Sequence, residues 1–146
     1  MSIGNAFMPT AGRYGVLPNL LAGRCDAAIG NTTTTTYNFG GHPAVCVINR
    51  AVVSAGTVPA STSGTILGVI KKYDSSANAA VTLTGDVDLE ALTASEGTAV
   101  TLLTTLTAAE KTLDTGDTLQ FVVTTTNTVT TAAVDLQVNI ELLVQA

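Results

Sequence analysis

The sequence contains one short match to a catalytic motif. Asp114-Thr115-Gly116 has the residue order found around the catalytic carboxylates of aspartic proteases, in which the aspartates of two such loops share a proton and activate water. A small residue normally follows that glycine, whereas here Asp117 follows it and adds a carboxylate that the motif lacks. Asp and Gly are common turn residues between strands, so we expect a tight turn with Gly116 at positive φ rather than a protease loop.

Three carboxylates occupy alternate positions further upstream. On a strand, Asp86, Asp88 and Glu90 would share one face, with spacings of about 6.5 to 7 Å between neighbours. Such a row is compatible with a calcium site completed by loop oxygens, or with a solvated outer face that discourages edge aggregation. No Asp-x-Asp-x-Asp-Gly loop accompanies the row, which favours the solvated face.

Histidine chemistry depends on a single residue. His42 is the one histidine of the chain, which excludes a histidine-rich metal site or a paired-histidine mechanism within one subunit. A Ser-His-Asp triad would have to use it, and no Gly-x-Ser-x-Gly sequence is present. The glycine loops typical of nucleotide sites are also missing from the sequence. We therefore expect no enzyme, no cofactor and no metal site, with His42 in a hinge.

Charge and cysteine content narrow the possible partners. The 146 residues carry 6 basic and 11 acidic side chains, a net charge of -5. Phosphate affinity comes from clustered Lys and Arg, so we expect no direct binding of nucleic acid. No apolar run is long enough to span a membrane, and residues 1–15 contain no recognisable export signal. Cys25 and Cys46 are expected to be reduced thiols, with a bridge between them as the alternative.

Beyond Gly41 the chain alternates apolar and polar residues, the pattern of half-buried strands. The expected strands cover residues 45–53, 65–73, 79–92, 98–106, 118–126 and 133–144, and clusters of Gly, Ser, Asp and Asn separate them. The 26 threonines supply β propensity together with a neutral polar surface. The sequence thus predicts an all-β fold, an antiparallel β-sandwich or jelly roll, with residues 44–146 as the sandwich domain.

The first 43 residues lack both the helical and the strand periodicity, and turn-forming Gly, Asn and Pro recur every few residues. Apolar side chains are nevertheless interspersed through this stretch. We expect residues 1–43 to form an extended N-terminal arm without regular structure, in which the threonine tract 32–36 is an edge strand or a linker. The arm either folds back over its own sandwich or docks onto another subunit, and its apolar content favours docking.

One segment resembles a known family. The stretch from Thr104 to Thr124, followed by a threonine-rich loop and the predicted strand from Val134 to Val144, resembles the C-terminal half of small jelly-roll proteins on tailed-phage particles, the head decoration or cement proteins. The resemblance covers about residues 79–145 and, more loosely, the arm. It implies a structural virion protein, assembled in the host cytoplasm, that binds the outer capsid surface, often as a homotrimer. Its partner would be the major capsid protein, whose neighbouring subunits it would clamp together.

The same resemblance implies that the arm docks onto the capsid. In this arrangement the arm adds a strand to a neighbour's sheet edge, and its arginines pair with capsid carboxylates. The expected docking residues are Phe7, Arg13, Tyr14, Leu17, Leu20, Leu21 and Arg24. Two other structural roles stay open. A phage fibre or receptor-binding module would more often display aromatic-lined sugar sites, and a tail or baseplate component would polymerise with itself.

Overall fold

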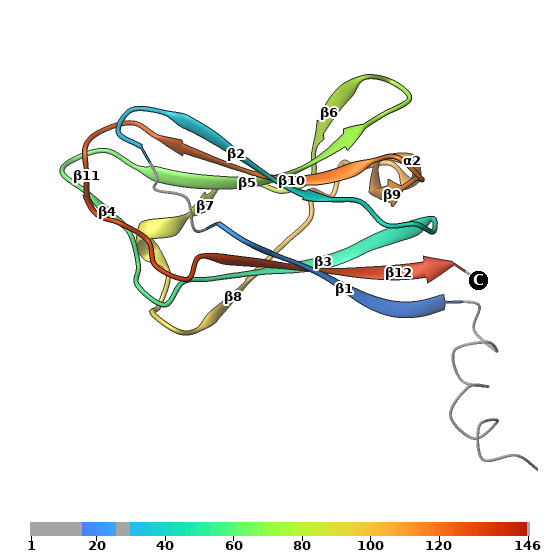
Figure 1. The fold of residues 1–146 in the computed structure, drawn as a ribbon, viewed down its shortest axis with the longest axis horizontal. Helices are drawn as coiled ribbons and strands as arrows, with labels where there is room; N and C mark the ends of the chain where they lie inside the picture. The colour runs from blue at the N-terminus through green and yellow to red at the C-terminus, as the bar shows by residue number, and fades with distance from the viewer. Residues whose placement is uncertain (1–15, 26–29, 146) are drawn as a thin grey trace, which may run out of the picture.

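The computed structural model describes residues 16–25 and 30–145, and the side chains of residues 16–19 lie outside this description. Two antiparallel sheets pack face to face, as the two ribbon layers of Figure 1 show. This arrangement confirms the predicted all-β sandwich. None of the described helices is long and apolar enough to cross a membrane.

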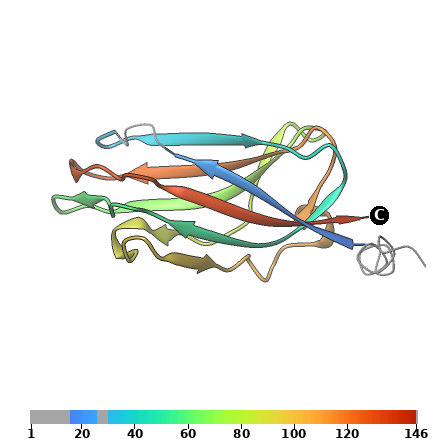
Figure 2. The ribbon, with the colours of Figure 1, turned by 60° about the horizontal axis from the view of Figure 1, so that its bottom comes forward.

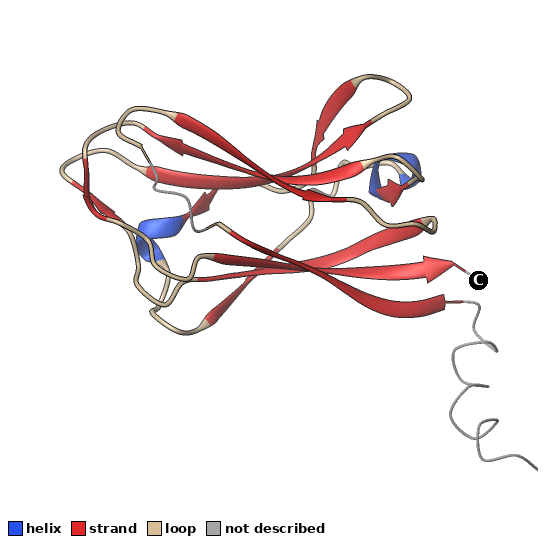
Figure 3. Cartoon of the chain, viewed as in Figure 1, coloured by secondary structure: helices blue, strands red, loops and turns tan. Residues whose placement is uncertain are grey.

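The first sheet has the strand order β1-β12-β3-β8, with β9 also pairing β3, and the second has the order β2-β10-β5-β6, with β7 also pairing β5. A two-stranded sheet of β4 and β11 lies at one end of the sandwich (Figure 3). The strands are β1 (Val16–Arg24), β2 (Thr34–Gly40), β3 (Cys46–Ser54), β4 (Ala60–Ser61), β5 (Ile66–Asp74), β6 (Ala79–Thr82), β7 (Val87–Asp88), β8 (Gly97–Val100), β9 (Thr112–Leu113), β10 (Thr118–Thr125), β11 (Val129–Thr131) and β12 (Gln137–Gln145). The short helices are η1 (Leu89–Ala91) and α2 (Ala108–Lys111).

The connectivity is that of a jelly roll. Four antiparallel pairs are nested in the chain: β1 with β12, β2 with β10, β3 with β8, and β5 with β6. The long strands alternate between the sheets: β1 and β3 belong to the first sheet, and β2 and β5 belong to the second. The chain therefore forms one long antiparallel ribbon that is wrapped into two layers. Each sheet therefore contains strands that are far apart in the sequence.

Alternating side chains from both sheets fill the core. In and just before β12, Leu136, Val138, Ile140 and Leu142 are fully buried, as their alternation predicts. The facing sheet contributes Phe121 and its alternate neighbours, which are buried to the same extent. Burial of apolar side chains on both inner faces is the main favourable term in the folding of such a sandwich.

Several strand predictions hold, and two are wrong, one of them because the strand expected over 98–106 forms only as β8, from Gly97 to Val100. The strands expected at 45–53, 65–73 and 118–126 correspond closely to β3, β5 and β10. The single strand expected over 79–92 is instead split into β6, β7 and η1. The C-terminal strand is also shorter than expected, because Asp135 has φ of 51° and interrupts the extended backbone before β12.

The expectation of an irregular arm is wrong for two parts of residues 1–43. Residues 16–24 form β1, which pairs with β12 along its whole length, and residues 34–40 form β2, which pairs with β10. Of the two placements considered, folding back over the chain's own sandwich describes these strands. The threonine tract continues into β2, at the end of its sheet. The residue types of β2 do not reveal which side chains face inward, because threonines occupy both its inner and its outer positions.

Candidate functional site

The predicted docking residues fall into two groups. Phe7, Arg13 and Tyr14 lie outside the described residues. The other four lie in β1, where Leu17 is paired in register with Val144. The structure therefore brings Leu17, Leu20, Leu21 and Arg24 onto one strand at the end of a sheet.

The two faces of β1 have different roles. Leu21 is in register with buried Ile140 and packs against the core. Leu20 is in register with Glu141, points to the outer face, and has 62% of its surface exposed. The apolar surface of Leu20 is thus accessible, whereas Leu21 contributes to the fold.

Arg24 forms an ion pair with Asp135, which lies in the turn before β12. Both side chains are more than half exposed, so solvent screens the attraction and its contribution to stability is small. The pair joins the end of β1 to the turn in which the backbone of Asp135 takes its positive φ. A capsid carboxylate would have to compete with Asp135 for the same guanidinium group.

The predicted motif at Asp114 forms a turn. The N–H of Asp117 donates to the carbonyl of Asp114 at 3.0 Å, and Gly116 has φ of 97°, as expected for the third position of a tight turn. The turn joins β9 to β10, which belong to different sheets, so it is a corner between layers rather than a hairpin. One carboxylate oxygen of Asp117 accepts from the N–H of Asp114 at 3.0 Å and thereby stabilises the corner.

The row of three carboxylates does not form. The side chain of Asp88 caps η1 by accepting from the N–H of Glu90 at 3.0 Å. The carboxylate of Glu90 accepts from the N–H of Ser61 at 2.6 Å and from the N–H of Ile66 at 3.2 Å. Glu90 thus holds the chain between β4 and β5 rather than facing solvent in a row. Among the described residues, no three His, Cys, Asp or Glu side chains are grouped as metal ligands would be.

The remaining chemically distinctive residues have structural roles. His42 lies in the connection between β2 and β3, where its Nδ1 accepts from the N–H of Ala44 at 3.0 Å. Cys25 and Cys46 are both buried and are not joined by a disulfide, as expected for reduced thiols. Burial raises the pKa of the Cys46 thiol, which disfavours the reactive thiolate.

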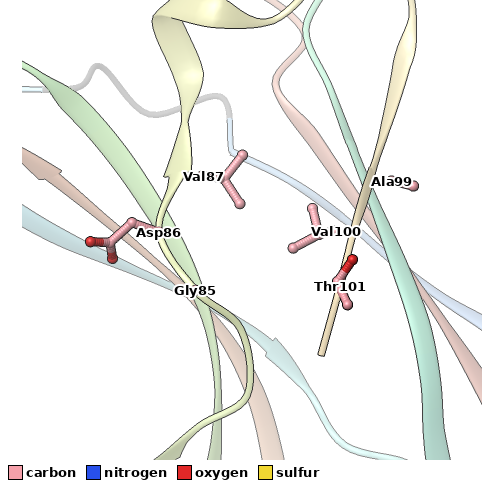
Figure 4. Close-up of a pocket in the computed structure, with 6 residues that line it drawn as sticks. All are labelled: Gly85, Asp86, Val87, Ala99, Val100 and Thr101. Carbon is pink, nitrogen blue, oxygen red and sulfur yellow. The ribbon is translucent and has the colours of Figure 1, made fainter. Parts of the chain in front are cut away.

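Two hollows adjoin β8. The smaller is lined by the chain around β7 and by residues 99–101 (Figure 4). Its apolar side chains Val87 and Val100 point toward one another, whereas the carboxylate of Asp86 points away (Figure 4). This hollow therefore lies between the edges of the two sheets, and the side chains that point into it in this view are apolar.

The larger hollow is a groove of about 600 Å³ alongside β3. One wall is formed by residues 47–52 of β3, and the other by residues 99–104 together with Lys111. The volume lies within the usual range for ligand sites, about 300 to 1,000 Å³. The charged residues that line it, Arg50 and Lys111, are both basic, although the whole chain is acidic. The sequence did not indicate this groove.

No family model, curated protein or solved structure matches this chain. The jelly-roll topology, the exposed outer face of β1 and the basic groove beside β3 therefore carry the functional interpretation. A fold of this kind supports many functions, so the interpretation depends on these surfaces rather than on the architecture.

Proposed function

We propose that this protein is a structural virion protein that binds the outer surface of an icosahedral phage capsid and clamps neighbouring major capsid subunits. The resemblance of residues 79–145 to head decoration proteins suggests this function, and the jelly-roll connectivity is compatible with it. The proposed partners are the major capsid protein and other copies of the same chain, in a homotrimer. No catalysis, cofactor, membrane or nucleic acid is part of the proposed function.

The position of β1 carries the proposal. This strand ends the first sheet, and it follows directly from residues 1–15, which contain Phe7, Arg13 and Tyr14. It begins beside the C-terminal end of β12, where Val16 is in register with Gln145 (Figure 2). Residues 1–15 thus precede the start of an edge strand in the sequence, and we propose that they contact a neighbouring subunit.

Leu20 supplies an apolar contact on the same strand. It is the most exposed of the large apolar side chains in the described residues, at 62%. A capsid surface that covers Leu20 and binds residues 1–15 would gain affinity from burial of apolar area. Because a shell offers many equivalent sites to a symmetric oligomer, modest contacts of this kind add up to stable attachment.

Co-sedimentation with capsids that lack this protein tests the proposal. The full-length chain should bind saturably, in a fixed ratio to the major capsid protein. Deletion of residues 1–15 should abolish binding, and Leu20→Asp should weaken it by at least about tenfold, as for a central apolar contact. Val134→Asp is the matched control, because Val134 is also exposed, at 52%, but lies in the turn beside the C-terminal end of β1, the end opposite residues 1–15.

Each outcome has a defined meaning. Binding that is lost with Leu20→Asp and kept with Val134→Asp supports attachment through β1. If the full-length chain does not bind capsids, the proposed function is wrong. Assembly of the purified chain into rings or rods would indicate a tail or baseplate component. Recognition of cell-surface glycans would indicate a fibre or receptor-binding module. Circular dichroism of each variant would establish that the sandwich is folded.

A further inference from the structure

Strand β3 has a gap in its pairing on the side away from β12. Strand β8 pairs with residues 51–54 of β3, and β9 pairs with Cys46 and Val47. Within the described part of the chain, residues 48–50 between them have no strand partner on this side. A short length of sheet edge is therefore open in the interior of the first sheet rather than at its border.

The path of the chain explains the gap. After Val100 the chain leaves β3 and crosses toward the second sheet, where Leu102 bridges Thr84 and the N–H of Leu103 donates to the carbonyl of Leu83 at 2.9 Å. It then passes through α2 and returns to β3 as β9. Figure 1 shows this excursion between β8 and α2. The groove of about 600 Å³ occupies the space that the excursion leaves beside residues 48–50.

The pairing of β3 with β12 is also irregular at this level. The register shifts between Glu141 and Leu142, so that Asn49 is the extra residue between Ile48 and Arg50. A bulge of this kind twists the strand locally and is common where a sheet edge is adapted for another purpose. The open edge and the bulge therefore coincide on the same three residues.

The charge of the groove selects among possible occupants. The guanidinium group of Arg50 is paired with Glu141 at 2.8 Å. Lys111, at the end of α2, has no ion pair with any described residue, although it lines the groove. An open backbone edge beside an unneutralised lysine is complementary to an extended segment that carries a carboxylate. The long edge strands β1 and β2 contain no carboxylate, which argues against insertion of these strands from a second copy.

We propose that this groove binds an extended acidic peptide segment of a partner protein, which adds to β3 at residues 48–50 and places a carboxylate against Lys111. The identity of the partner rests on the proposed function: the peptide would be a surface segment of the major capsid protein. The binding itself depends only on the open edge and the lysine. Main-chain hydrogen bonds supply the affinity, and Lys111 supplies the selectivity.

Titration of the labelled protein with short synthetic peptides, followed by NMR, tests the inference. The probes are end-blocked peptides of about six residues in which valine alternates with glutamate, the same peptide with lysine in place of glutamate, and the glutamate peptide with N-methylated backbone amides. The glutamate peptide should shift the amide signals of residues 48–50 and 99–104 saturably at concentrations up to about 5 mM. The lysine peptide and the N-methylated peptide should give no saturable shifts there.

Two charge-reversal variants distinguish binding through Lys111 in the groove from a general effect of net charge on peptide affinity. Lys111→Glu should weaken binding of the glutamate peptide by about fivefold or more, as expected for loss and reversal of one surface charge pair. Lys71→Glu is the matched control, because Lys71 alternates with buried Ile70 and Lys72 and so faces outward from the second sheet. It makes the same change in net charge and should leave the affinity unchanged.

Several results would overturn the inference. These are no saturable shifts at residues 48–50, equal binding of the N-methylated or lysine peptide, or equal effects of the two charge reversals. Saturable shifts confined to β1 or β2 would place β-addition at the outer sheet edges instead.

Failure of this inference is distinguishable from failure of the proposed function. If wild-type protein and Lys111→Glu bind capsids equally while deletion of residues 1–15 abolishes binding, the function stands and the groove is not the capsid site. If the glutamate peptide binds the groove but no capsid binding occurs, the peptide site stands and the capsid function fails.

Discussion

The Nζ atom of Lys72 lies 3.9 Å from Oδ2 of Asp117, and both side chains are buried, with only 2% of each exposed. The ammonium group also donates to the carbonyls of Ala109 at 3.1 Å and Thr112 at 2.8 Å. The other oxygen of Asp117 accepts from the N–H of Ser75 at 2.9 Å. This buried polar cluster therefore joins the end of β5, helix α2 and the corner before β10.

Replacement of Asp117 tests the importance of this cluster. Asp117→Ala leaves the buried ammonium group of Lys72 without its counter-charge and the N–H of Ser75 without its acceptor. We expect the free energy of unfolding, measured with urea, to fall by about 3 to 5 kcal/mol. Lys71→Met, at the neighbouring outward position, should change it by less than about 0.5 kcal/mol. A loss below about 1 kcal/mol for Asp117→Ala would show that the cluster contributes little.

Gly68 is expected to be intolerant of any side chain. A Cβ atom at this position would lie 2.2 Å from Cζ of Phe121, whose ring occupies the space above the glycine. Gly68→Ala should therefore force the ring out of place and destabilise the domain by about 1 to 3 kcal/mol in thermal or urea unfolding. Gly85→Ala is the control, because no atom lies within 4 Å of the position that a Cβ would occupy there. Similar effects of the two substitutions would contradict this explanation.

The capping carboxylate of α2 should make stability depend on acid pH. Hydrogen bonds from the N–H and hydroxyl of Thr107 hold the pKa of Glu110 below its ordinary value of 4.5. Since folding lowers this pKa, the stabilisation is present above pH 4.5 and is lost as the pH falls through the lowered folded-state value. Glu110→Gln should have a lower melting temperature than wild type at neutral pH.

The difference between the two proteins should shrink as the pH falls below 4.5, because wild-type Glu110 then becomes neutral as well. Hydrogen bonds also lower the pKa values of Asp74 and Glu141, so both proteins should become less stable in acid. A melting-temperature difference that stays constant from about pH 7 to about pH 3 would show that Glu110 titrates in the same way in the folded and unfolded states.

The two cysteines should react only when the domain unfolds. Cys25 is 2% exposed and Cys46 is 0% exposed, and burial raises the pKa of the Cys46 thiol. We expect neither thiol to react with Ellman's reagent under native conditions, and both to react in denaturant. Rapid reaction of either thiol in the native protein, or a disulfide detected by mass spectrometry, would contradict the buried, unbridged cysteines described above.

Local chemistry made several features predictable from the sequence. Alternation placed Val138 and Ile140 in the core, because successive side chains of a strand point to opposite faces. The positive φ of Gly116 follows from the turn sequence Asp114-Thr115-Gly116, because glycine adopts this conformation without steric cost. For the two adjacent lysines, Lys71 and Lys72, alternation alone does not explain how a charged side chain can be buried. One of them had to face inward, but its partners at Ala109, Thr112 and Asp117 are brought close only by the fold.

The sequence by itself thus determined the fold class and the inward faces of the regular strands, because these depend on the alternation of apolar and polar residues within each strand. Tertiary structure decided which strands are neighbours. Arg24 meets Asp135 across 111 residues of chain, and β1 and β2 become parts of the sandwich only through pairing with β12 and β10. The open edge at residues 48–50 likewise arises from the path of another segment. Alternation identifies the face to which a side chain points, whereas hydrogen bonding between distant strands identifies its neighbours.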